Sequence, residues 1–128
     1  MAELEFIDRV AERTGVPEDT AALITGNTLL TLAARISGGE AEDLAERVPD
    51  RLRPYLIKVT EPAVPFSYDE FMRRVAEYAG VDPATAERGV AAVLSALHET
   101  VGHKEFTDAM AQLPKEFDQL VATASTAR

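Results

Sequence analysis

The sequence predicts an all-α protein, a compact bundle of about eight helices built from two tandem four-helix repeats. Apolar residues recur at spacings of three and four along most of the chain, which is typical of amphipathic helices. No segment shows the sustained alternation of apolar and polar residues that predicts a half-buried strand. The sequence also resembles itself at an offset of 65 residues without a gap, since FIDRVAERTGV at 6–16 aligns with FMRRVAEYAGV at 71–81. Such self-similarity is the mark of a duplicated unit.

The duplication divides the chain into two units, residues 3–58 and 67–123, joined by a linker at 59–66. Pro62 and Pro65 favour an extended, non-helical course for this linker. Units of this length seldom bury enough apolar surface to fold alone. We therefore expect residues 1–128 to form a single globular domain.

The first unit is expected to contain four helices, at about 3–13, 18–36, 40–47 and 50–57. Phe6 lies on the apolar stripe of the first of them, as Phe71 does in the second unit, and both are expected in the core. Pro54 makes the fourth helix short or bent, because proline cannot donate a helical hydrogen bond.

The second unit carries clearer helix boundaries. Ser67 and Glu70 form a capping-box pattern. In this pattern the serine hydroxyl accepts a hydrogen bond from the backbone N–H of the glutamate, and the glutamate carboxylate accepts one from the backbone N–H of the serine. Gly80 is typical of the end of that helix. The second helix of this unit is expected to begin at Asp82-Pro83 and to end at Gly102. A short helix is expected at 105–111, and Pro114 is expected to begin the last helix.

Composition excludes several classes of function. The chain has 22 acidic and 13 basic residues, a net charge of −9, which disfavours nucleic acid and anionic membrane surfaces as partners. It has no cysteine, so disulfides and thiolate nucleophiles are excluded. No signal peptide and no apolar run long enough to cross a membrane is visible, so we expect a cytoplasmic protein.

Four segments carry a resemblance to a known family, namely 6–16, 38–49, 71–81 and 105–114. On these segments the chain resembles the bacterial family catalogued as domain of unknown function 2267, over roughly residues 3–122. The resemblance implies a helical, repeated fold. That family carries no established activity, so the resemblance implies no catalytic residues.

The residues themselves point to no catalytic or metal site. His98 and His103 resemble the zinc motif H-E-x-x-H but are five residues apart, about 140° from a shared helix face. They are therefore interpreted as solvated histidines near a helix end. Glu40 and Glu105 stand at helix starts, where negative charge favours the helix dipole, although a cation site is an alternative. We expect a non-enzymatic protein without metal or cofactor.

The expected helix at 18–36 is unusual because it is apolar around most of its circumference. One interpretation makes it the central helix, enclosed by the second unit, with Gly89 allowing a neighbouring helix to approach. The other makes one of its faces a contact surface for another chain. The residues proposed for that surface are Leu23, Ile24, Asn27 and Leu30, of which Leu23, Ile24 and Leu30 stand where the second unit has Arg88, Gly89 and Ser95.

Two threonines in the same helix, Thr25 and Thr28, replace valines of the second unit. They are candidates for a ligand pocket between the repeats, although threonine hydroxyls bonded to carbonyls one turn back explain them equally well. The predicted function is therefore protein–protein interaction, through a partner or as a homodimer, in a regulatory or stress-associated role. A small-molecule binder with that pocket is the alternative.

Overall fold

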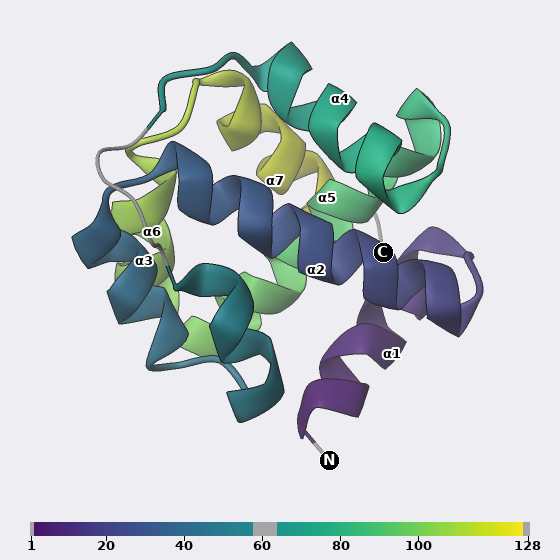
Figure 1. Ribbon diagram of the computed structural model, residues 1–128, viewed down its shortest axis with the longest axis horizontal. Helices are drawn as coiled ribbons and strands as arrows, with labels where there is room; N and C mark the ends of the chain where they lie inside the picture. Colours follow the sequence, from purple (N-terminus) through teal and green to yellow (C-terminus); the bar gives the residue numbers. More distant parts are fainter. Residues whose placement is uncertain (1, 58–63, 127–128) are drawn as a thin grey trace.

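The computed structural model describes residues 2–57 and 64–126, and in these ranges every regular element is helical (Figure 1). The all-α prediction is confirmed. Residues 58–63, which include most of the expected linker and Pro62, lie outside the described residues. The elements are α1 (Ala2–Thr14), α2 (Glu18–Arg35), α3 (Gly38–Ala45), the 3-10 helix η1 (Asp50–Leu56), α4 (Tyr68–Ala79), α5 (Pro83–Val101), α6 (His103–Met110) and α7 (Glu116–Thr126).

Corresponding elements recur at the 65-residue offset. The bounds of α3 and α6 differ by this number at both ends, and so do the first residues of α2 and α5. The last pair differs in kind, because η1 is a 3-10 helix with Pro54 inside it whereas α7 is an α-helix. Proline lacks the amide hydrogen that an α-helical bond requires, which confirms the expected short or bent fourth helix.

The two long helices, α2 and α5, pack against each other, and the other elements pack on them (Figure 1). Both α1 and α4 contact α2 and α5, so the first helix of each half contacts the long helix of the other half. In addition η1 packs on α2, α7 packs on α5, and α3 contacts α6.

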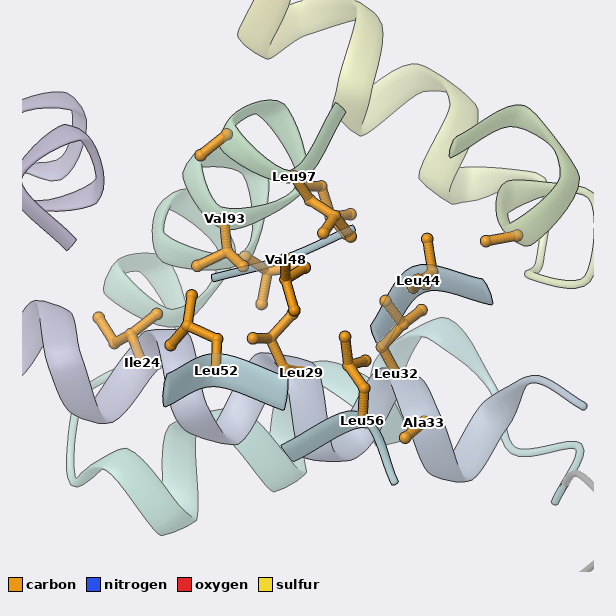
Figure 2. Close-up of a cluster of buried hydrophobic side chains, with 14 of the residues drawn as sticks. Ile24, Leu29, Leu32, Ala33, Leu44, Val48, Leu52, Leu56, Val93 and Leu97 are labelled. Carbon is orange, nitrogen blue, oxygen red and sulfur yellow. The ribbon is translucent and has the colours of Figure 1, made fainter. Parts of the chain in front are cut away.

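One hydrophobic cluster receives side chains from both halves. Figure 2 shows apolar side chains of α2 directed toward those of α5, with side chains of η1 and of the α3 segment closing the space. Phe6 and Phe71 are both buried in this cluster, as expected. The labelled members are Ile24, Leu29, Leu32, Ala33, Leu44, Val48, Leu52, Leu56, Val93 and Leu97.

The start of α4 confirms half of the expected capping box. The Ser67 hydroxyl accepts a hydrogen bond from the backbone N–H of Glu70, at 3.1 Å. The Glu70 carboxylate, however, accepts from Arg73 Nε at 2.8 Å and from Arg74 Nε at 2.9 Å. Two guanidinium donors on the same helix face satisfy the carboxylate better than one amide, and this explains the difference.

Polar contacts join the end of α2 to the second half. Arg35 donates from Nε to the backbone oxygen of Phe66 and from Nη1 to that of Gln112, both at 2.8 Å. The side-chain oxygen of Gln112 accepts from the backbone N–H of Ser37 at 2.7 Å. These bonds fix the α2–α3 turn against the α6–α7 turn.

Candidate functional site

The part of α2 that stays exposed is a narrow apolar stripe. Leu23 and Leu30 are 51% and 49% exposed. Asn27 lies between them, one turn from each, and donates from Nδ2 to the backbone oxygen of Leu23 at 2.8 Å. No charged residue occurs on α2 between Asp19 and Arg35. The two half-exposed leucines therefore lie on an uncharged stretch of helix.

Ile24, the fourth residue proposed for the contact surface, does not lie on it. Its side chain is fully buried. A Cβ atom added at Gly89 would lie 2.6 Å from Cγ2 of Ile24, so the glycine is what lets α5 approach α2 here. The structure thus divides the proposed set. Ile24 belongs to the core, as in the central-helix interpretation, and the other three residues lie at the surface.

The stripe continues onto the chain that leads into α4. The backbone N–H of Val64 donates to the backbone oxygen of Ala34 at 2.9 Å, and the Val64 side chain is exposed. The surface formed by Leu23, Asn27, Leu30, Ala34 and Val64 is called the α2 face below.

The equivalent surface of α5 is polar, and arginine side chains of α1 contact it. Ser95, which corresponds to Leu30, accepts a hydrogen bond from Arg13 of α1 at 3.1 Å. Glu99, which corresponds to Ala34, pairs with the same Arg13 at 2.9 Å and with Arg9 at 3.6 Å. The α2 face lacks such groups, so the two halves differ in which of their surfaces is apolar.

Tyr78 adds an aromatic side chain to the helix beside the α2 face. It stands 65 residues after Arg13, and α4 packs on α2 as α1 packs on α5. Tyr78 is 63% exposed. The spacing of apolar residues predicts Tyr78 on the buried stripe of its helix with Phe71 and Val75, and this prediction is wrong for Tyr78, whose correspondence with Arg13 in the aligned repeats indicates a surface position.

The two candidate pocket residues, Thr25 and Thr28, are completely buried. Among the described residues neither hydroxyl has a hydrogen-bond partner. By contrast, the Thr31 hydroxyl donates to the backbone oxygen of Asn27 at 2.6 Å. The back-bonding explanation therefore holds for Thr31 but not for Thr25 and Thr28.

Acidic residues gather where α3 meets α6. Burial raises the pKa of Glu40, and the neighbouring charges of Asp108, Asp43 and Glu105 raise it further. Within residues 2–57 and 64–126, no group of three or more histidine, cysteine or acidic side chains is arranged to hold a metal ion. The acidic cluster therefore offers no candidate metal centre.

Fold and surface together define a small helical bundle with one uncharged, exposed helix face. The sequence profile of the family described as "Uncharacterized conserved protein (DUF2267)" matches residues 3–120, and the chain belongs to this family. No curated protein matches it. In the part of the chain that the structure describes, the helices are too short or too polar to cross a membrane.

Proposed function

We propose that this protein is a non-enzymatic, cytoplasmic interaction module in a regulatory or stress-associated role, and that it associates with a second copy of itself through the α2 face. The observation that carries the proposal is the exposure of Leu23 and Leu30 on an uncharged face. Elsewhere α2 is occupied by contacts with α1, α4, α5 and η1.

The spacing along the α2 face suits pairing of two identical helices. Leu23, Asn27, Leu30 and Ala34 follow one another at intervals of four, three and four residues, which is the spacing of the d and a positions of a coiled coil. A single asparagine at an a position is known to fix the register and the number of paired helices. Asn27 is the only polar member of this series.

The absence of charge on the α2 face matters for the association of two acidic copies. Two chains that each carry a net charge of −9 repel one another. An interface without charged residues adds no close like-charge contact to that repulsion. The uncharged α2 face is therefore a surface on which two acidic copies can associate.

The test exchanges the leucines for the residues that α5 carries at the same positions. The double variant Leu23→Arg, Leu30→Ser should stay folded, because a helix of the same fold already carries arginine and serine there. Sedimentation velocity at tens of micromolar should show a dimer for the wild type and a monomer for the variant.

Leu4→Arg is the matched control, since Leu4 of α1 is also half exposed, at 48%, and lies outside the α2 face. This variant should remain a dimer. A wild-type chain that sediments as a monomer would contradict the proposal, and so would a dimer that both variants preserve.

A second candidate function, a small-molecule binder, is supported by the unpartnered hydroxyls of Thr25 and Thr28. Buried polar groups without a partner are uncommon and require an explanation. A small polar ligand that accepts from both hydroxyls would supply one. Native mass spectrometry of freshly purified protein should then show a bound small molecule that the Thr25→Val, Thr28→Val variant lacks.

A further inference from the structure

We propose that His98 and His103 form a two-imidazole binding site for a divalent transition-metal ion of the zinc class. Nε2 of His98 and Nδ1 of His103 are hydrogen-bonded to each other at 3.1 Å, so a metal ion bound by both nitrogens would replace the proton that they share. Two nitrogen ligands about 2.05 Å from one ion are about 2.9 Å apart at an octahedral angle and about 3.3 Å apart at a tetrahedral angle. The observed separation lies between these two values.

The turn at Gly102 brings the two rings together. His98 is in the last turn of α5, and Gly102 ends that helix with a φ of +92°. His103 is the first residue of α6. As expected, the two histidines lie at a helix end and are at least partly exposed, but the turn at Gly102 also brings their rings into contact, which their spacing along the sequence does not predict. Adjacent helices thus present facing nitrogen atoms.

Neighbouring side chains hold both rings in place. The ring of His98 stacks on Phe106, with centroids 4.3 Å apart and planes 6° apart. The hydroxyl of Thr107 lies 3.5 Å from Nε2 of His103, the nitrogen that does not face His98. Histidines that bind metals commonly have their second nitrogen oriented by such a polar group.

The composition makes this pair the sole source of imidazole ligands. The chain contains two histidines and no cysteine. Imidazole nitrogen is a preferred ligand of Zn²⁺, Cu²⁺ and Ni²⁺. The nearest basic side chain in sequence, Lys104, is paired with Asp108 at 2.9 Å. His103 is exposed and His98 partly exposed, so water can complete the coordination of the ion.

The site belongs to the second half alone. In the first half the positions of His98, His103, Phe106 and Thr107 are taken by Ala33, Gly38, Ala41 and Glu42, so that half has no imidazole ligand. The structural roles shared by the two halves therefore do not require the histidines. Metal binding gives these residues a role that the fold itself does not supply.

The test is a calorimetric titration of the tag-free protein with Zn²⁺. We expect one ion per chain and a loss of affinity of about a hundredfold in His98→Ala and, separately, in His103→Ala, because two linked ligands bind far more tightly than either alone. Asp43→Asn is the control, since it removes a carboxylate of the acidic cluster and leaves both imidazoles in place.

A second measurement does not depend on the folding of any variant. In nitrogen-15 spectra of the wild type, Zn²⁺ should shift Nε2 of His98 and Nδ1 of His103 together, at one equivalent. Shifts of only one ring, or equal affinity in wild type and both histidine variants, would overturn the proposal. An affinity loss in Asp43→Asn as large as in the histidine variants would do so too, because the acidic cluster would then be the site.

Discussion

At the scale of single residues, Thr25 and Thr28 are the buried groups whose presence the packing does not explain. Their counterparts in α5 are Val90 and Val93, which have the same shape and no hydroxyl. All four side chains are completely buried. A buried hydroxyl without a partner loses its hydrogen bonds to water and gains none.

Replacing either threonine by valine should therefore stabilise the protein. We expect Thr25→Val and Thr28→Val each to raise the free energy of unfolding by about 1 kcal/mol, the lower end of the penalty for an unsatisfied buried hydroxyl. Urea denaturation followed by circular dichroism measures the change.

Thr31→Val is the matched control for these substitutions. The Thr31 side chain is also buried, but its hydroxyl bonds to Asn27, so this variant should lower the free energy of unfolding. If Thr25→Val and Thr28→Val are destabilising as well, their hydroxyls are satisfied in solution, by water or by a ligand. That result would favour the small-molecule candidate.

At the scale of elements, the first turns of α4 show how local charge affects stability. Hydrogen bonds from Arg73 and then Arg74 lower the pKa of Glu70 to about 2. A carboxyl group whose pKa is lowered by folding stabilises the folded state when it is ionised. This contribution is complete above the ordinary pKa of glutamate and disappears as the pH falls toward 2.

Glu70→Gln should accordingly lower the melting temperature at pH 7. The difference from the wild type should shrink between about pH 4.5 and pH 2, because the wild-type carboxylate becomes protonated in this range. Glu77→Gln serves as the control, since Glu77 is more exposed and makes one longer contact with Arg73, at 3.3 Å. A melting-temperature difference for Glu70→Gln that does not vary with pH would refute this assignment.

The sequence predicted the helices well because their signals are local. Serine at position 67, glycine at 80 and the Asp82-Pro83 pair act within one turn of the residues they affect. Pro54 likewise acts on its own helix. Periodicity placed Phe6 and Phe71 in the core for the same reason.

The site was less predictable because it depends on how helices approach each other. Leu23 and Ile24 are adjacent apolar residues, and only the close approach of α5 at Gly89 buries one and leaves the other exposed. The meeting of His98 and His103 depends on the direction of the turn at Gly102. The number of residues between the two histidines does not predict the direction that the chain takes at this turn.

At the scale of the whole molecule, the crossing of α2 and α5 joins the two halves. An alanine at position 89 would place its Cβ 2.6 Å from a branch carbon of buried Ile24. Because that carbon cannot move away without shifting a helix, we expect Gly89→Ala to lower the free energy of unfolding by about 1–3 kcal/mol. Denaturation in urea measures this loss.

Gly26→Ala is the comparison for this prediction. An added Cβ there would meet the ring of Tyr55 at 3.0 Å, but that ring is partly exposed and can turn outward. The gain in helix propensity, about 1 kcal/mol, should offset much of the cost. Equal effects of the two substitutions would show that α2 and α5 are not closely packed at Gly89.

The contact between Ile24 and Gly89 has a consequence for symmetry. These two residues are 65 positions apart, so each is the counterpart of the other, and they touch where an axis relating the two halves would pass. In a dimer of identical half-length chains this place would hold the same residue twice. Two isoleucines would overlap, and two glycines would leave a void. Joining the halves in one chain allows a large residue to face a small one, and such close crossing of the long helices requires this inequality.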